Sequence, residues 1–215
     1  MKERKMNAYW KKNLFPLAVE IAFIISCFVI PAEYFIYTNF LFYFVLLLYF
    51  VAVKDFSAKE WGKNLKGGKA FWKPVGITVF FFMLAFAATM ILESTFPQWD
   101  TGMIGLRRDN WFKLVLFAIS TIVLPPVVEE TFYRKNLIVT ENKNVMAATV
   151  VFSMLLYAAE HSLTPWGIFL TMLWALPLSV SYVKTKNVFI PMTAHFLVNF
   201  VGNGADVVFT IIGML

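Results

Sequence analysis

Long apolar stretches alternate with short polar ones along the whole chain. A helix that crosses a bilayer needs about 20 mostly apolar residues, because lipid offers no partners to backbone polar groups. Seven stretches fit this description, at residues 14–31, 39–53, 76–92, 111 to about 136, 144–160, 167–183 and 188–203. The apolar tail, residues 205–215, is too short to cross unaided, and we expect a partial eighth helix there. The predicted fold class is therefore all-α, a polytopic transmembrane bundle of seven to eight helices.

Composition agrees with a membrane protein. Of the 215 residues, 60% are hydrophobic and only 15% are charged. Soluble domains are typically about 45 to 50% apolar and about 25% charged. The 24 phenylalanines are spread along the chain, so we expect a single integral membrane domain over residues 1–215. The only cysteine, Cys27, excludes an intrachain disulfide and a multi-thiolate metal site.

The formal net charge is +6, and the basic residues fall at alternate ends of the predicted spans. They precede the first span and follow the second, fourth and sixth: Lys2, Arg4, Lys5, Lys11 and Lys12; Lys54, Lys59, Lys63, Lys66, Lys69 and Lys73; Arg134, Lys135 and Lys143; Lys184 and Lys186. Because Lys and Arg are enriched in cytoplasmic loops, this arrangement predicts a multi-pass plasma-membrane protein with a cytoplasmic N-terminus. The partners that we expect for these charges are membrane lipids, and not nucleic acid.

Ionisable residues inside the predicted spans are few, and each is a functional candidate because burying charge in lipid is costly. Glu129, Glu130 and Arg134 follow the tandem prolines Pro125 and Pro126 in the fourth span. Glu130 and Arg134 are four residues apart on a helix and can pair, whereas Glu129 points about 100° away. The prolines can kink the helix and admit water. We therefore predict that Glu129 is a general base or acid.

The only two histidines also lie in predicted spans. Tyr157 precedes His161 by four residues, and Asn199 follows His195 by four, so each pair shares a helix face. A lone histidine on an apolar face is more often a hydrogen-bonded core residue, but two of two beside a glutamate pair favour a site. Glu129, His161 and His195 could either hold a divalent metal such as zinc or position a water directly. Both alternatives stay open at this stage.

The ordered set Glu-Glu-x-x-x-Arg, aromatic-x-x-x-His and His-x-x-x-Asn, on successive late helices, resembles the CPBP family. These are the CAAX-processing and bacteriocin-processing (Abi) intramembrane endopeptidases. The resemblance covers roughly residues 123–203, and it departs from the family at Tyr157, where the motif commonly has Phe. It implies an all-helical bundle with a catalytic core at about residues 111–203, and peptide-bond hydrolysis within or beside the bilayer.

The resemblance also implies residue roles: Glu129 as the general base, Glu130 with Arg134 as a structural pair, His161 and His195 as partners of the water or of a metal, and Asn199 as an oxyanion donor. We expect Tyr133 and Tyr157 to contact the substrate or support the site, with the Tyr157 hydroxyl available to bond Glu129. The motifs make no cofactor certain. By family analogy we expect a peptide or protein substrate at the membrane. Peptide maturation or bacteriocin immunity is expected in preference to prenyl-protein processing.

Two geometric expectations concern residues inside the spans. Glu20, in the first span, is explained by snorkelling or by pairing with the lysines just before that span. At 1.5 Å per residue from the cytoplasmic side, Glu129 and His195 lie about 10 to 15 Å deep, but His161 lies about 25 Å deep. The fifth predicted helix must therefore tilt, kink or begin above the membrane if the three are to meet.

Two other function classes remain open. One is a non-catalytic membrane regulator or immunity protein that keeps the motifs for packing, and the other is a proton-coupled carrier, which no inverted repeat supports. Other intramembrane protease chemistries fit poorly. The chain has no His-Glu-x-x-His motif and no membrane aspartate pair, since Asp206 stands alone near the tail. The sequence therefore predicts an intramembrane endopeptidase acting on a membrane-associated peptide or protein.

Overall fold

The computed structural model describes residues 2–215, with side chains from residue 9 onward. All regular elements of these residues are helical apart from one isolated β-bridge. The bounds are α1 Lys2–Val29, η1 Ala32–Tyr34, α2 Phe35–Ala52, α3 Ala58–Leu65, α4 Gly68–Thr95, α5 Trp111–Ala118, η2 Ile119–Val123, α6 Leu124–Glu129, η3 Glu130–Asn136, α7 Lys143–His161, α8 Pro165–Thr185 and α9 Phe189–Met214. The predicted all-α class is confirmed.

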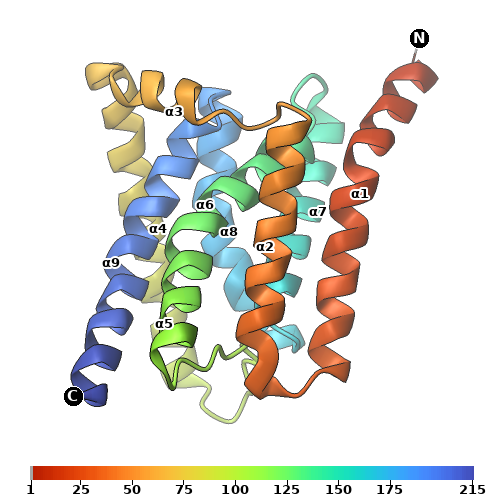
Figure 1. Ribbon diagram of the computed structural model, residues 1–215. Coiled ribbons are helices and arrows are strands. Elements are labelled where there is room, and N and C mark those ends of the chain that lie inside the picture. The colour runs from red at the N-terminus through yellow and green to blue at the C-terminus, as the bar shows by residue number, and fades with distance from the viewer. Residues whose placement is uncertain (1) are drawn as a thin grey trace.

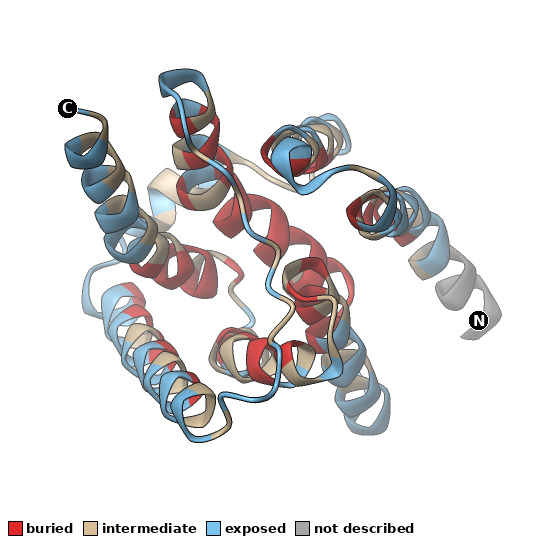
Figure 2. Cartoon of the chain, turned by 90° about the horizontal axis from the view of Figure 1, so that it is seen from below, coloured by how far each residue is buried: buried red, intermediate tan, exposed pale blue. Residues whose placement is uncertain are grey.

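The long helices run between the two ends of a bundle (Figure 1). α5, η2, α6 and η3 follow one another without a break, and this central helix crosses the bundle obliquely (Figure 1). α2 and α9 both pack against α6, while α4, α8 and α9 contact one another and α7 packs on α8. Seen from below, the central helix is buried along most of its length, whereas the outer helices expose one face (Figure 2). The N-terminus and the C-terminus lie at opposite ends of the bundle (Figure 1).

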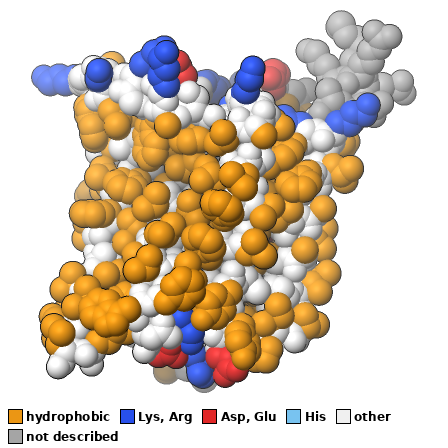
Figure 3. All heavy atoms as spheres, in the orientation of Figure 1, with side chains coloured by type: hydrophobic (Ala, Val, Ile, Leu, Met, Phe, Trp, Pro, Cys, Tyr) orange, Lys and Arg blue, Asp and Glu red, His pale blue; other side chains and the backbone are white. Residues whose placement is uncertain are grey.

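Six of the described helices are long and apolar enough to cross a membrane: Tyr9–Val29, Ala32–Ala52, Gly68–Thr95, Trp111–Asn136, Pro165–Thr185 and Phe189–Met214. With hydrophobic side chains covering the visible face between the bundle ends (Figure 3), the chain is a multi-pass integral membrane protein. α7, predicted as a span, has 19 residues but is not among the six, because polar residues occupy both of its ends.

The predicted partial eighth helix is wrong. α9 runs unbroken over 26 residues to Met214, so the tail extends the last span instead of forming a separate element. No proline interrupts the helix after Pro191, and the glycines of the tail only lower its helix propensity. At 1.5 Å per residue, α9 is about 39 Å long, enough to cross a bilayer with some tilt.

The tandem prolines account for an irregularity in the central helix. Pro125 and Pro126 have no backbone N–H, so neither can donate to a carbonyl one turn earlier. The chain widens just before them into the π-helical segment η2, and a second π-helical segment, η3, begins directly after Glu129. Such segments are rare and concentrate at functional sites. The disturbance predicted beside the glutamates is therefore present, as a change of helical pitch.

Hydrogen bonds join the loop between α4 and α5 to the turn between α7 and α8. Ile104 N donates to the carbonyl oxygen of His161 at 3.0 Å, and Ser162 Oγ donates to that of Thr101 at 2.6 Å. A Cβ atom at Gly167 would overlap both the Thr101 carbonyl and the Ser162 hydroxyl, so only glycine permits this approach. The loop thereby fixes the backbone of His161.

Lys and Arg side chains gather at the end of the bundle where α3 lies, whereas the opposite end carries few of them beside acidic atoms (Figure 3). This distribution agrees with the predicted clustering of basic residues on one side of the membrane. The side chains of Lys2, Arg4 and Lys5, which belong to that prediction, lie outside the described residues.

Candidate active site

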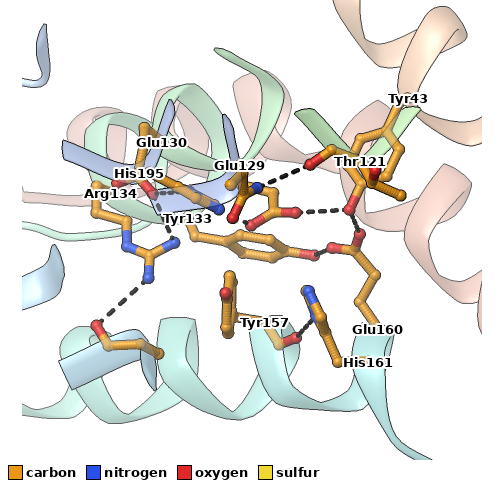
Figure 4. A network of polar contacts seen from close by, with 12 residues as sticks. Tyr43, Thr121, Glu129, Glu130, Tyr133, Arg134, Tyr157, Glu160, His161 and His195 are labelled. Atoms are coloured by element: carbon orange, nitrogen blue, oxygen red, sulfur yellow. Dashed lines mark hydrogen bonds and ion pairs between the residues drawn. The ribbon is translucent and has the colours of Figure 1, made fainter. Parts of the chain in front are cut away.

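A cavity of about 400 Å³ lies inside the bundle. It is lined by α2, α4, the central helix, α7, α8, α9 and the α4–α5 loop. Among its lining residues are Glu129, Tyr157, His161, His195 and Asn199. Three helices therefore bring the Glu129 carboxylate and both imidazoles to a single space, which Glu160 also lines (Figure 4). The depth difference estimated from straight helices does not keep them apart, since the central helix runs obliquely (Figure 1).

Glu130 and Arg134 form the ion pair that their spacing predicted. Arg134 Nη1 lies 3.3 Å from Glu130 Oε1, and both side chains are fully buried. The same Glu130 oxygen lies 3.0 Å from His195 Nδ1, a contact that the sequence did not predict. Arg134 also donates to the Ala175 carbonyl at 3.3 Å and lies over the Tyr157 ring at 4.7 Å. With a hydrogen on Nδ1, the Glu130 contact fixes the His195 ring and leaves its Nε2 as an acceptor.

Glu129 is fully buried and pairs with no arginine of the described residues. Its Oε1 accepts a hydrogen bond from the Tyr43 hydroxyl at 2.5 Å. Its Oε2 has no hydrogen-bond donor among the described residues and lies 3.9 Å from His195 Nδ1, too far for a direct bond. One oxygen of the Glu129 carboxylate therefore stays available. Tyr43 was missed because it is one of many aromatic residues in α2.

His161 ends α7, and its ring is held by its own helix. Nδ1 lies 2.8 Å from the Tyr157 carbonyl oxygen, and the ring stacks on Tyr157 with centroids 4.6 Å apart. A hydrogen on Nδ1 leaves Nε2 as an acceptor, as in His195. Tyr157 contributes its ring to His161 and to Arg134, and the expected bond from its hydroxyl to Glu129 is absent among the described side chains.

Asn199 donates from Nδ2 to the carbonyl oxygen of Thr121 at 2.9 Å, and Asn203 does the same at 3.0 Å. In an α-helix this carbonyl would accept from Pro125, which has no N–H, so the two amides replace a missing backbone donor. One N–H of Asn199 is committed to this bond, and the other is left for the predicted oxyanion role. Asn203 was missed, although it continues the four-residue spacing of His195 and Asn199.

Two further glutamates belong to the buried network. Glu160 lies within hydrogen-bond distance of both Tyr43 and Tyr133, and Glu20 lies 2.7 Å from the Tyr133 hydroxyl. The exposed fraction of Glu160 is 4% and that of Glu20 is 0%. Glu160 was not weighed as a site residue, although it is an ionisable residue directly before His161 in a predicted span.

The explanation given for Glu20 from the sequence is wrong. Its side chain turns inward to Tyr133 instead of snorkelling. Of the nearby lysines, Lys12 pairs with Asp55 at 3.0 Å. Glu20 lies two helical turns beyond Lys12, too deep in α1 for a lysine at the end of the span to reach.

The cavity is closed around the glutamates and open at its other end. Glu129 and His195 are 0% and 2% exposed. In contrast, the Arg108 and Asp206 side chains, which also line the cavity, are 32% and 51% exposed and form an ion pair at 3.4 Å. Asp206 thus pairs with the α4–α5 loop. The α4–α5 loop, which carries Arg108, lies at the bundle end opposite α3 (Figure 1), so the exposed lining residues place the mouth at that end.

A divalent metal was one alternative for Glu129, His161 and His195. In each imidazole, a hydrogen on the bonded Nδ1 leaves Nε2 as an acceptor, and Nε2 has no hydrogen bond to the described residues. However, no three His, Cys, Asp or Glu side chains of the described residues are placed to hold one ion together. The side chains as they lie therefore do not fit a three-ligand metal centre.

The fold and site define a polytopic helical membrane protein with a buried cluster of glutamate and histidine around an internal cavity. Residues 111–201 match the family model described as Rce1-like, type II CAAX prenyl endopeptidase. The chain therefore carries a domain of the Rce1-like CAAX endopeptidase family, a family of intramembrane proteases, and the predicted family is confirmed. The match includes all three motifs. Curated proteins and solved structures gave no significant match.

Proposed function

We propose that this chain hydrolyses a peptide bond within the membrane, with water activated by Glu129 and assisted by His161 and His195. The observation that carries the proposal is the common cavity, which these side chains line from α6, α7 and α9. Peptide hydrolysis needs a base that removes a proton from water and donors that stabilise the charge forming on the carbonyl oxygen. A buried carboxylate beside two imidazoles supplies the first requirement.

The contacts support one role for each residue. Glu129 Oε2, which has no donor among the described residues, takes the proton from water and passes it to the leaving amine. Nε2 of His195 accepts the second hydrogen of the same water, and His161 lines the same cavity. Glu130, paired with Arg134, keeps the His195 ring in place. The free N–H of Asn199 donates to the oxyanion.

The membrane topology that we propose has seven spans, with α7 as the seventh. The chain ends lie at opposite ends of the bundle, which an even number of crossings cannot produce (Figure 1). α7 runs between the same two ends as its neighbour α8, on which it packs (Figure 1). The lysine-rich end then faces the cytoplasm of a plasma membrane, and the N-terminus lies there.

The position of the cavity mouth limits which substrates can reach Glu129. Arg108 and Asp206 lie at the end away from the lysines, which is the outer face in this topology. A prenylated C-terminus in the cytoplasm would approach from the opposite end. We therefore favour a membrane-associated peptide that reaches the cavity from the outer face, as peptide maturation or immunity against a secreted peptide would require.

The test uses purified protein in lipid vesicles and two quenched fluorescent peptides, one hydrophobic and unprenylated, the other farnesylated with a CAAX end. Wild-type protein should cleave the first faster than the second. Glu129→Gln, His161→Ala and His195→Ala should each lower the rate by about 100-fold or more, whereas exposed Glu60→Gln on α3 should not. The unfolding temperature of each variant checks its fold.

Two results would contradict the proposal. Cleavage by Glu129→Gln at the wild-type rate would favour a non-catalytic role for the motifs. Proton-linked uptake into vesicles that Glu129→Gln stops, without any peptide cleavage, would favour the carrier instead.

A further inference from the structure

Two tyrosine hydroxyls join three buried glutamates into one chain, in the order Glu129, Tyr43, Glu160, Tyr133 and Glu20 (Figure 4, except Glu20). The Tyr43 hydroxyl lies 2.5 Å from Glu129 Oε1 and also contacts Glu160 Oε1. The Tyr133 hydroxyl lies 2.5 Å from Glu160 Oε2 and 2.7 Å from Glu20 Oε2. These five side chains come from five different elements, and none is more than 4% exposed.

The number of hydrogens in this chain limits its charge. Each of the four oxygen–oxygen contacts needs one hydrogen, and each tyrosine hydroxyl supplies only one. The other two must come from carboxyl groups, so at least two of the three glutamates are protonated and at most one is ionised. Ionising all three would place like charges beside one another in a buried bundle, which is strongly unfavourable.

The surroundings identify the ionised member. Glu129 Oε2 lies 3.9 Å from Nδ1 of the His195 imidazole, whereas no lysine, arginine or histidine nitrogen of the described residues lies within 4.0 Å of a Glu20 or Glu160 carboxyl oxygen. The buried guanidinium of the neighbouring Arg134 is paired with Glu130. Glu129 is also the glutamate to which the proposed function assigns the role of base, so the one charge that the chain can hold is placed on Glu129.

We propose that Glu20 and Glu160 are held protonated and act as positioning residues, which keep Tyr43 donating to the Glu129 carboxylate. The chain then runs in one direction: Glu20 donates to Tyr133, Tyr133 to Glu160, Glu160 to Tyr43, and Tyr43 to Glu129. This inference rests on the proposed role of Glu129 as the base. It explains why two carboxyl groups that touch no cation lie in the interior.

Substitution by glutamine distinguishes a protonated glutamate from an ionised one, because the glutamine amide has a donor and an acceptor in positions similar to those of a protonated carboxyl group. Glu160→Gln and Glu20→Gln should keep the direction of the chain, while Glu129→Gln removes its charge. The first measurement is the infrared carbonyl band of protonated carboxyl groups, taken on purified protein at neutral pH. Glu160→Gln and Glu20→Gln should each weaken this band, and Glu129→Gln and exposed Glu60→Gln should leave it. A wild-type protein without the band, or a band weakened by Glu129→Gln alone, would overturn the inference.

The second measurement is cleavage of the unprenylated peptide. Glu160→Gln should cleave about tenfold faster or more than Glu160→Leu, because leucine leaves both tyrosines without a partner. If Glu160→Gln instead loses as much activity as Glu129→Gln, the charge lies on Glu160 and this inference fails while the proposed function stands. If Glu129→Gln still cleaves, the proposed function fails, and the infrared band still decides which glutamates are protonated. Unfolding temperatures confirm that each variant is folded.

Discussion

Removing Arg134 is the change whose cost follows most directly from the structure. Arg134→Met keeps much of the side-chain volume but leaves the Glu130 carboxylate buried, with His195 as its only ion-pair partner among the described residues. Two unit charges at the observed 3.3 Å attract by about 5 kcal/mol at an effective dielectric constant of about 20. Proteins in which one partner of a buried pair is removed lose about 3 to 5 kcal/mol. We expect a loss of this size in the free energy of unfolding, measured by denaturant titration in detergent micelles.

Two companion variants make this prediction specific. Glu130→Met combined with Arg134→Met removes both charges, and we expect it to recover most of the loss, less about 1 kcal/mol for the contact to His195. Arg108→Met breaks an ion pair whose side chains are 32% and 51% exposed, and should cost no more than about 1 kcal/mol. An Arg134→Met protein as stable as the Arg108→Met protein, or a double variant less stable than Arg134→Met alone, would refute the reasoning.

Three further predictions concern positions around the cavity. Gly167→Ala should lower the free energy of unfolding by about 1 to 3 kcal/mol, because the new Cβ atom meets the α4–α5 loop. Gly105→Ala should not lower it, because no atom lies within 4 Å of a Cβ at that position. Equal unfolding temperatures for the two variants would contradict the predicted clash at Gly167. Asn203→Ala should lower the free energy of unfolding by about 1 kcal/mol, because the Thr121 carbonyl loses a donor. Adding Pro125→Ala should reduce this loss, because residue 125 then has an N–H that can donate to the same carbonyl. An unchanged loss would mean that the asparagine does not replace the missing backbone donor. Tyr43→Phe should slow peptide cleavage by about tenfold or more, since it removes the donor to the carboxylate, and a wild-type rate would contradict this.

Much of the fold was predictable because membrane-spanning helices appear in the sequence as long apolar runs. Apolar runs of the right length located all six helices that qualify as spans, and the motif spacing placed Glu130 beside Arg134 correctly. The residues at which the helices end were harder to predict from the sequence. The tail was read as a separate helix because its apolar length falls short of a span, although the chain simply continues α9 to Met214.

The site was predictable only where motifs repeat at helical spacing. Glu129, His161 and His195 were found in this way, and all three line the cavity. Tyr43 and Glu20 were not, because they come from helices far earlier in the chain and carry no local pattern. Their contacts depend on how α1 and α2 pack against the central helix. A tyrosine among many aromatic residues gives no sign of which hydroxyl will face a carboxyl group.

The central claim is that Glu129 and His195 act together on one water, and a double-mutant cycle of peptide cleavage tests it most directly. Residues that serve the same step as a unit have strongly non-additive effects. Glu129→Gln and His195→Ala should each slow cleavage by about 100-fold or more. The protein with both changes should be no more than about tenfold slower than the slower single variant. Losses that multiply in the double variant would mean that the two side chains act independently, and would contradict the account.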